Sequence, residues 1–239
     1  MKIAAFDLEI ARILPEETRD LFAHAPLGIT CAAVARSDGP TTVWQNSPQL
    51  TRDEARSLVH DLQGLVQEGY TLVSWNGCNF DFRVLAEESG LVAECGDLAL
   101  AHVDLMLFVT FTKGYFLAFD KALKGARLAG KLPSVTLGDG RVIAHVGANA
   151  PALWAQGEID AVLTYLRRDV EQLVKLAAAI LAQRAIRWTS GTGTPQSVPV
   201  NKLLSVRDCF RLPKPDTSWM SSPPTRAQFV SWIPGVALS

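Results

Sequence analysis

The residues best suited to chemistry are carboxylates that interrupt apolar segments. Asp7 and Glu9 stand two residues apart in the run AAFDLEIA. Because side chains alternate between the two faces of a strand, a strand here would project both carboxylates from one face, about 7 Å apart. A carboxylate in so apolar a setting is costly unless it is paired or binds a cation. Taken alone, the pair also fits a strand end or a solvated edge.

A second acidic position follows a short apolar segment in SWNGCNFDF, where Asn76 precedes Asp81 by five residues. We expect a buried strand over 71–75, a turn, and a helix that begins near Phe80. Asp81 would then fall in the first turn of this helix. An ordinary capping carboxylate would also be found there.

The third segment is YLRRD, in which Tyr165 and Asp169 are four residues apart. On a helix these two residues share one face. That face is otherwise apolar, so Asp169 is a buried charge that needs a partner. Arg167 or Arg168 could supply one, and a functional site is the alternative.

Taken together and in this order, the three segments resemble the motifs of the DEDD family of 3′–5′ exonucleases, a branch of the ribonuclease-H-like superfamily. FDLEI is similar to the family's D-x-E motif, NGCNFD to its N-x-x-x-F-D motif, and YLRRD to its third motif. The third motif has either a Tyr four residues before its Asp or a His five before it. Tyr165 and Thr164 match the Tyr subtype. The resemblance covers roughly residues 1–185.

The resemblance implies a metal-dependent 3′–5′ exonuclease in which Tyr165 orients the attacking water. The four carboxylates that it implies as ligands of two Mg²⁺ or Mn²⁺ ions are Asp7, Glu9, Asp81 and Asp169. Carboxylate oxygens are the donors that such hard cations prefer. Two ions about 4 Å apart can stabilise the attacking and leaving oxygens of a displacement. With an ordinary pKa of about 10, Tyr165 would position the water rather than take its proton.

Substrate contacts are assigned to Leu8, Trp75 and Asn76. Asn76 matches the Asn of the second motif and would support the site. Trp75 could stack on a base, although core packing is the commoner role of such a residue. Asp104 could reach the site, but we expect it to act in a cap or loop. The expected partner is single-stranded nucleic acid or a 3′ end, of DNA or RNA.

The formal net charge of −1 argues against a general basic coat of the kind that binds nucleic acid non-specifically. Bound cations would offset the carboxylates, so a nuclease is not excluded. A local basic run is the candidate path for a strand, although a solvated face is the commoner fate of such a run. The run consists of Lys113, Lys121, Lys124, Arg127, Lys131 and Arg141.

Composition predicts a soluble, cytoplasmic protein with no membrane partner. No apolar stretch is long enough to cross a bilayer, and acidic residues interrupt the N-terminal segment where a signal peptide would be apolar. The four cysteines form no C-x-x-C pair, so we expect free thiols and neither a zinc site nor a disulfide framework. They are Cys31, Cys78, Cys95 and Cys209.

The order of expected elements predicts an α/β, ribonuclease-H-like domain over residues 1–187, with a mixed central sheet flanked by helices. Thr51 and Glu54 have the spacing of a capping box, and Asn149 with Pro151 would open a short helix that runs through Trp154. Strands are expected at 2–10, 27–36 and 41–45, forming an antiparallel meander, and at 71–75. Helices are expected at 51–68, 80–90, 115–128 and 158–187, with an apolar segment near Asp104 and a hairpin turning at 138–140.

Residues 188–239 differ in composition, with seven of the thirteen prolines and three of the six tryptophans. Prolines prevent long regular elements, and tryptophans are rare in disordered tails. We therefore expect an extended C-terminal arm that packs on the core. Its expected role is to close one side of the substrate groove or to offer a surface to a protein partner.

Two alternatives to an active exonuclease remain open. One is a degenerate relative that binds nucleic acid or a protein partner without cutting. Retention of all four carboxylates and the tyrosine speaks against it, because burying them without metal is costly. The other is a metal phosphodiesterase for small nucleotides, which the lack of a strong basic stripe leaves open.

Overall fold

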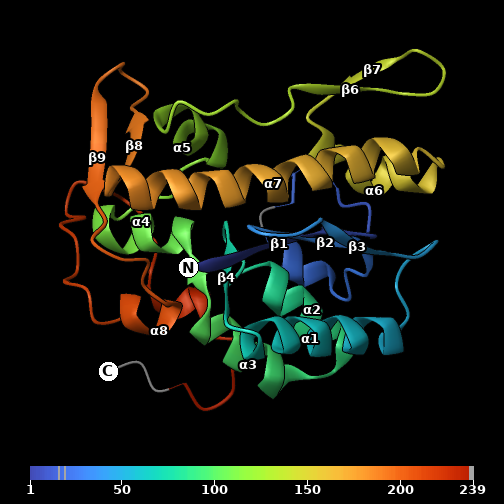
Figure 1. Ribbon diagram of the computed structural model, residues 1–239, viewed down its shortest axis with the longest axis horizontal. Coiled ribbons are helices and arrows are strands. Elements are labelled where there is room, and N and C mark those ends of the chain that lie inside the picture. Colours follow the sequence, from blue (N-terminus) through green and yellow to red (C-terminus); the bar gives the residue numbers. More distant parts are fainter. Residues whose placement is uncertain (16, 19, 237–239) are drawn as a thin grey trace.

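A computed structural model describes residues 1–15, 17, 18 and 20–236. Its centre is a sheet in which the strands lie in the order β3-β2-β1-β4-β5 (Figure 1). The β1–β2 and β2–β3 pairs are antiparallel, whereas β1–β4 and β4–β5 are parallel. The predicted meander and mixed sheet are thus confirmed. The strands are β1 (Lys2–Ile10), β2 (Ile29–Arg36), β3 (Thr42–Gln45), β4 (Tyr70–Ser74) and β5 (Val103–Asp104).

Helices cover both faces of this sheet, as expected for an α/β fold. The long helix α7 (Ile159–Gln183) crosses one face and contacts β1 and β2, and helices pack on the opposite side (Figure 1). That second layer contains α1 (Arg52–Gln67), α2 (Asp81–Ser89) and α3 (Val92–Ala101). Further elements are η1 (Leu21–His24), α4 (Leu105–Lys113), α5 (Phe119–Gly125), α6 (Val146–Ala155) and the hairpin β6–β7 (Ser134–Thr136 and Val142–Ala144).

Small residues line the sheet beside the two carboxylates of β1. The cross-strand partner of Asp7 is Ala33, and that of Glu9 is Cys31. Directly opposed residues project from the same face of the sheet, so these short side chains leave room for both carboxylates beneath α7. The other face of β1 is apolar: Phe6 packs on Phe82 of α2, with ring centroids 5.4 Å apart.

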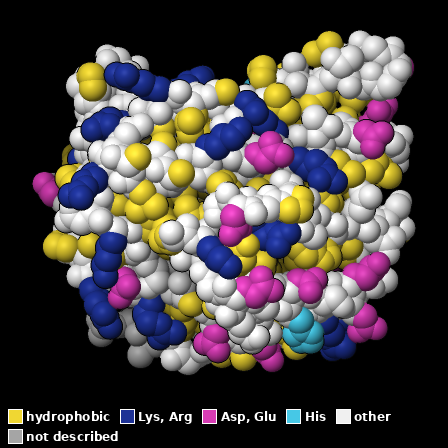
Figure 2. Space-filling model, in the orientation of Figure 1, with side chains coloured by type: hydrophobic (Ala, Val, Ile, Leu, Met, Phe, Trp, Pro, Cys, Tyr) yellow, Lys and Arg dark blue, Asp and Glu magenta, His cyan; other side chains and the backbone are white. Residues whose placement is uncertain are grey.

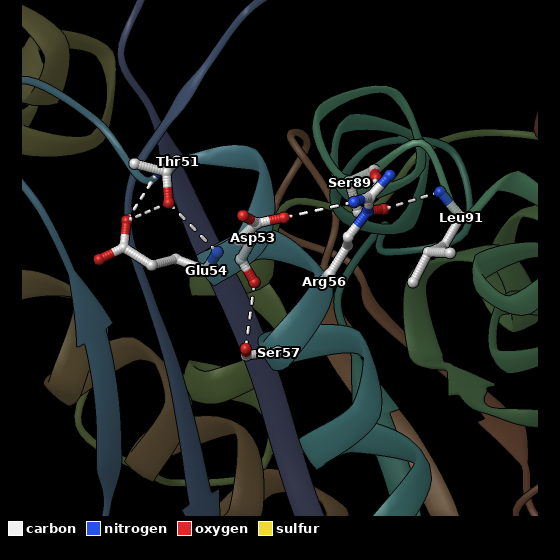
Figure 3. A network of polar contacts seen from close by, with 7 residues as sticks. All are labelled: Thr51, Asp53, Glu54, Arg56, Ser57, Ser89 and Leu91. Atoms are coloured by element: carbon white, nitrogen blue, oxygen red, sulfur yellow. Dashed lines mark hydrogen bonds and ion pairs between the residues drawn. The ribbon is translucent and has the colours of Figure 1, made fainter.

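The predicted capping box at the start of α1 is confirmed (Figure 3). The Thr51 hydroxyl accepts from the Glu54 backbone N–H at 3.3 Å, and the Glu54 carboxylate accepts from the Thr51 N–H at 2.7 Å. Nearby, Arg56 donates to the carbonyl of Ser89 at 3.1 Å, which joins α1 to the end of α2. Hydrogen bonds at helix ends therefore stabilise this helical layer in addition to the packing of its apolar side chains.

Three helices have boundaries that differ from the sequence prediction. Helix α6 begins at Val146, so Pro151 lies inside it rather than in its first turn. Asn149 does not cap it, because its amide donates to the carbonyls of Ala144 and His145. Helix α7 ends at Gln183, not at 187, since Arg184 adopts a left-handed conformation with φ of 50°. Helix α3 was not predicted, and α5 is shorter than the expected 115–128.

The chain beyond α7 starts with a hairpin of β8 (Ala185–Thr189) and β9 (Pro195–Pro199), so β8 runs across the boundary at 187–188. Alternation explains this strand: Ile186 and Trp188 are buried while Arg187 is exposed. Up to residue 236, where its description ends, the arm then forms only the short helix α8 (Val206–Cys209) and the 3-10 turn η2 (Ala227–Phe229).

Apolar side chains of the arm are buried in the main core. Phe229 is fully buried, and its ring meets that of Phe111 with centroids 5.4 Å apart. Trp232 donates its indole N–H to the carbonyl of Cys78 at 2.9 Å. By contrast, Trp219 is 67% exposed. The arm therefore contacts the loop between β4 and α2, which precedes Asp81.

No helix in the described part of the chain combines the length and apolarity needed to cross a membrane. The cysteines are free and buried, in agreement with the sequence prediction.

Candidate active site

Three elements bring the predicted acidic residues together. Asp7 and Glu9 lie on β1, Asp81 is the first residue of α2, and Asp169 lies midway along α7. The Asp81 carboxylate accepts from the backbone N–H of Leu8 at 3.1 Å. This hydrogen bond joins α2 to β1 at the residue between Asp7 and Glu9. Asp81, Glu9 and Asp169 are each at most 9% exposed. The carboxylates thus gather where β1, α2 and α7 meet, with Asp7 partly buried and the other three buried.

Asp81 does not act as a helix cap, because no side-chain capping bond is present at the start of α2. Its place is set instead by the preceding loop. Asp104 accepts from the backbone N–H groups of Asn76 (3.0 Å), Cys78 (3.1 Å) and Leu107 (3.0 Å), which fixes the turn between β4 and α2. The expected cap and loop role of Asp104 is confirmed.

Asp169 is paired with a residue from a distant loop. The Nζ atom of Lys131 lies 2.5 Å from Asp169 Oδ2 and 4.9 Å from the centre of the Tyr165 ring. Arg167 and Arg168, the partners considered from sequence, form no ion pair with Asp169 within the described residues. The other carboxylate oxygen, Oδ1, is buried without a hydrogen-bond partner there.

The loop that carries Lys131 is held by Asp120 of α5. The Asp120 carboxylate accepts from the backbone N–H of Lys131 at 3.1 Å and forms an ion pair with Lys124 at 2.5 Å. Lys131 is therefore anchored by its main chain while its side chain reaches the acidic cluster. Sequence analysis placed Lys131 in the basic run but gave it no part in the site. A signal for this role was present in the sequence, because four carboxylates expected to cluster need a nearby positive charge.

Burial and mutual repulsion disfavour the charged forms of these acids. Burial, followed by the charge of Asp169, raises the pKa of Asp7 to about 6. The pKa values of Glu9 and Asp81 are raised well above their ordinary values, mainly by burial and then by the charge of Asp7. Burial also raises the pKa of Asp169, although Lys131 opposes this. Without a bound cation, the protonated forms of these acids are therefore favoured, whereas a cation at the cluster would favour the ionised forms.

Lys131 is held in its charged form. Burial lowers its pKa, but the charges and hydrogen bonds of Asp169 and Tyr165 outweigh this effect, so that the pKa is raised. Its side chain is one third exposed, at 33%. An ammonium group thus stands beside the acidic cluster, with access to solvent.

Tyr165 lies on the same face of α7 as Asp169, as its spacing predicted. It is buried, and burial together with the charge of Asp169 raises its pKa above the ordinary value. Its hydroxyl lies against Gly147 of α6: a Cβ atom at position 147 would come within 2.9 Å of that oxygen. Sequence analysis did not identify this contact between α6 and α7.

The residues assigned to substrate contact occupy different settings. The side chain of Leu8 is buried at 2% exposure. Trp75 is half-buried and packs against Phe119, with ring centroids 5.2 Å apart. Asn76 adopts a left-handed conformation with φ of 73°, and its side-chain oxygen is buried without a partner in the described structure. Their contact with a substrate stays a prediction.

A cleft of about 640 Å³ opens beside Glu9. Its walls are largely apolar and include Ile10, Ile13 and Phe80, with Asn149 and Arg12 as polar groups. A space of this size and character is typical of a site for a small organic molecule or one unit of a polymer. The acidic cluster thus has a neighbouring space where a nucleotide could be held.

The donor set fits a hard divalent cation. Within residues 1–15, 17, 18 and 20–236, no three His, Cys, Asp or Glu side chains are placed so that they could hold a metal ion as they stand. The chemistry of the cluster nevertheless matches such an ion: it offers four carboxylates, and one buried oxygen of Asp169 has no partner. Side-chain rotations and withdrawal of the Lys131 ammonium from Asp169 would be needed.

Comparison with known proteins gives a match to the fold only. No protein-family model matches the chain, and no curated protein matches it. Among solved structures, it is similar to the family B DNA polymerase from the hyperthermophilic archaeon Pyrobaculum calidifontis, with 21% identity and a TM-score of 0.51. The match covers 75% of this chain and 24% of the polymerase, so the chain spans about a quarter of that protein's length. The fold is ribonuclease-H-like. At this identity the likeness extends to the fold alone.

Proposed function

We propose that this chain is a metal-dependent 3′–5′ exonuclease that hydrolyses phosphodiester bonds in nucleic acid. One observation carries the proposal: carboxylates from β1, α2 and α7 meet at one place, with the Tyr165 hydroxyl beside them. Burying so many acids is unfavourable unless a cation offsets them. The ribonuclease-H-like fold agrees with the resemblance of the three sequence motifs.

Each side chain has a role in this proposal. One or two Mg²⁺ or Mn²⁺ ions would be held by Asp7, Glu9, Asp81 and Asp169. Such ions supply Lewis acidity that stabilises charge on phosphoryl oxygens and favours ionisation of water. Asp81 also fixes β1 against α2 through the Leu8 N–H. Asn76 and Asp104 keep the loop before Asp81 in place.

Tyr165 is assigned a positioning role. Its raised pKa keeps the phenol protonated at neutral pH, so that it can donate a hydrogen bond to the attacking water or to a phosphate oxygen. Gly147 leaves space for the hydroxyl at this place. The terminal nucleotide would lie in the cleft beside Glu9, against Phe80.

The contact between Lys131 and Asp169 favours a second candidate. An ammonium that permanently takes the place of a metal ion would give a protein that binds nucleic acid without cutting it. In the proposed enzyme, by contrast, Lys131 leaves Asp169 when metal binds. The two candidates differ in whether metal displaces Lys131 and whether hydrolysis follows.

A panel of 5′-labelled single-stranded DNA, single-stranded RNA and a blunt duplex, each with Mn²⁺ or with EDTA, tests the proposal. The expected result is a ladder of labelled products that shorten from the 3′ end with Mn²⁺ only. A parallel assay with bis(nitrophenyl) phosphate detects a phosphodiesterase that prefers small substrates. Binding of the strands with no cleavage under any condition would overturn the proposal in favour of the second candidate.

The proposal includes a cytoplasmic location and a nucleic-acid partner with a free 3′ end. The preference for DNA or RNA is an outcome of the same panel.

A further inference from the structure

Charge is divided unevenly along the chain. Residues 1–112 carry 16 Asp and Glu against 7 Lys and Arg, whereas residues 113–239 carry 8 against 16. The formal charges are therefore −9 and +8, although the whole chain carries −1. Such asymmetry is typical of proteins that bind a polyanion with one region. The acidic cluster contributes Asp7, Glu9 and Asp81 to the negative part and Asp169 to the positive part, so it accounts for only a small share of the asymmetry.

The fold gathers part of this positive charge on one surface. Helix α5 and strand β8 pack so closely that a Cβ atom on Gly125 would lie 1.7 Å from the carbonyl oxygen of Arg187. Gln183, at the end of α7, donates to the carbonyl of Ala126 at 3.3 Å and joins the same region. Five exposed basic residues lie on these elements and their ends, and we call them the α5–β8 patch. They are Lys121, Lys124, Arg127, Arg184 and Arg187.

The surface view agrees with this grouping. Figure 2 shows Lys and Arg side chains gathered on the left of the molecule, the side on which Figure 1 places β8, β9, α5 and α8. Most Asp and Glu side chains on this face lie to the right and along the lower edge. On this face, basic side chains therefore predominate on the left and acidic side chains on the right and along the lower edge.

Little acidic charge offsets the patch. Lys124 pairs with Asp120, and Arg187 donates to the neutral amide of Gln183 at 2.7 Å. In the part of the chain that the structure describes, Lys121, Arg127 and Arg184 form no ion pair. Like charges left together on a surface repel one another and favour binding of an anion.

The predicted basic run is divided by the fold. Arg141, at its far end, lies in the β6–β7 hairpin and pairs with Asp139 and Glu158. Lys113 is half-buried at the end of α4. Lys121, Lys124 and Arg127, from the middle of the run, lie in the same patch as Arg184 and Arg187. Their positions in the sequence did not indicate this.

One end of the patch, at Arg127, lies close in the chain to Lys131 of the acidic cluster. Arg127 precedes Lys131 by four residues, so their Cα atoms are at most about 14 Å apart. Asp120 of α5 holds the backbone of Lys131, which in turn contacts Asp169. A chain with repeated negative charges would therefore have a short distance to cover between Arg127 and the cluster.

We propose that the α5–β8 patch binds the phosphate backbone of a nucleic-acid strand whose 3′ end lies at the acidic cluster. This inference rests on the proposed function for the direction of the strand. The surface offers exposed positive charge, which suits contacts to phosphates rather than the reading of sequence. Binding by the patch would keep the substrate attached between successive cleavages.

The test measures binding separately from cleavage. Fluorescence anisotropy with a labelled 20-nucleotide strand in EDTA compares the parent with the triple variant Lys121→Gln, Arg127→Gln and Arg187→Gln. Each phosphate contact on a single strand contributes about −0.7 to the slope of log K against log salt. The triple variant should bind at least about tenfold more weakly at 50 mM salt, with a slope shallower by about 2.

A charge-matched control carries Lys2→Gln, Arg52→Gln and Arg56→Gln, on β1 and α1 away from the patch. It should retain the affinity and the slope of the parent. Equal affinities and slopes for the parent and the patch variant, with both folded by circular dichroism, would overturn the inference.

Cleavage of a dinucleotide, which is too short to reach the patch, separates this inference from the proposed function. If the chain is an exonuclease, the patch variant should cut the dinucleotide as fast as the parent but shorten the long strand more slowly, through a higher KM. If no variant cuts, the proposed function fails while the binding difference still supports the patch.

Discussion

Lys131 and Asp169 form an ion pair at the centre of the acidic cluster, with Nζ 2.5 Å from Oδ2. The two residues come from an irregular loop and from the middle of α7, and 37 positions separate them in the chain. The ammonium offsets part of the negative charge that the four carboxylates create. In the proposed enzyme it holds the place that a divalent cation takes, so its removal should affect metal binding directly.

Substituting Lys131→Met should strengthen Mn²⁺ binding several-fold, because the ion no longer competes with a positive charge. In EDTA the same variant should melt at a lower temperature than the parent, since Asp169 loses its partner. Isothermal titration and thermal unfolding give the two quantities. Lys124→Met, which removes an exposed ion pair with Asp120, is the control. Unchanged Mn²⁺ affinity for Lys131→Met would show that Lys131 does not occupy the cation's place.

Removing one acid should stabilise the metal-free protein at neutral pH. The folded-state pKa of Asp7 is raised to about 6, so the folded protein favours the protonated carboxyl. The contribution of this group to the free energy of unfolding is complete below the unfolded-state pKa of about 4. It is lost as the pH rises through 6, because the carboxyl then ionises in the folded protein. Asp7→Asn in EDTA should therefore gain on the order of 1–3 kcal/mol at pH 8 and little at pH 4. Melting curves at both pH values check this. A variant that is less stable than the parent at pH 8 would contradict the repulsion.

Tyr165→Phe should slow strand hydrolysis by roughly 10- to 10³-fold, since it removes only the hydroxyl that orients the reacting groups. Mn²⁺ affinity should remain near that of the parent. Single-turnover cleavage and calorimetry measure the two effects. A Phe variant as fast as the parent would make Tyr165 a core residue and nothing more.

The contact between Gly147 and the Tyr165 hydroxyl predicts a coupled effect. Gly147→Ala places a methyl group 2.9 Å from that oxygen, so it should displace the hydroxyl and slow hydrolysis. In the Tyr165→Phe background the same change should cost little more, because the oxygen is already absent. Gly64→Ala in α1, with no atom within 4 Å of the new Cβ, is the matched control. If the loss of rate in the double variant equals the sum of the two single losses, in free energy, the proposed contact is wrong.

The arm should resist removal from the core. Phe229 is fully buried, so Phe229→Ala should cost about 3–5 kcal/mol in the free energy of unfolding. Trp232→Phe, which loses the bond to the Cys78 carbonyl, should loosen the loop before Asp81 and lower Mn²⁺ affinity. Urea unfolding and titration measure these. Limited proteolysis that trims the chain to about residue 187 and leaves an equally stable, equally active fragment would refute the role of the arm.

Sequence patterns predicted much of the fold because periodicity and capping act locally. The alternation around Asp7, the capping box at Thr51 and the helical spacing around Asp169 each correspond to an element of the structure. The motif order also placed the acidic residues that the fold then brings together. These features depend on neighbours within a few positions.

The features that sequence could not predict depend on tertiary contacts. Asn149 bonds to the preceding turn instead of capping α6, and Arg184 ends α7 through a left-handed conformation. Lys131 reaches Asp169 only because Asp120 anchors its loop. The approach of β8 to α5, which joins Arg187 to the basic run, likewise has no local signal.

The most direct measurement of the central claim is the time course of cleavage of one 5′-labelled single strand by the parent and by Asp169→Asn, in Mn²⁺ and in excess EDTA. Only the parent in Mn²⁺ should produce a ladder that shortens from the 3′ end, while circular dichroism shows both proteins folded. Full turnover in EDTA, or an Asp169→Asn variant as active as the parent, would contradict a metal-dependent site built from these carboxylates.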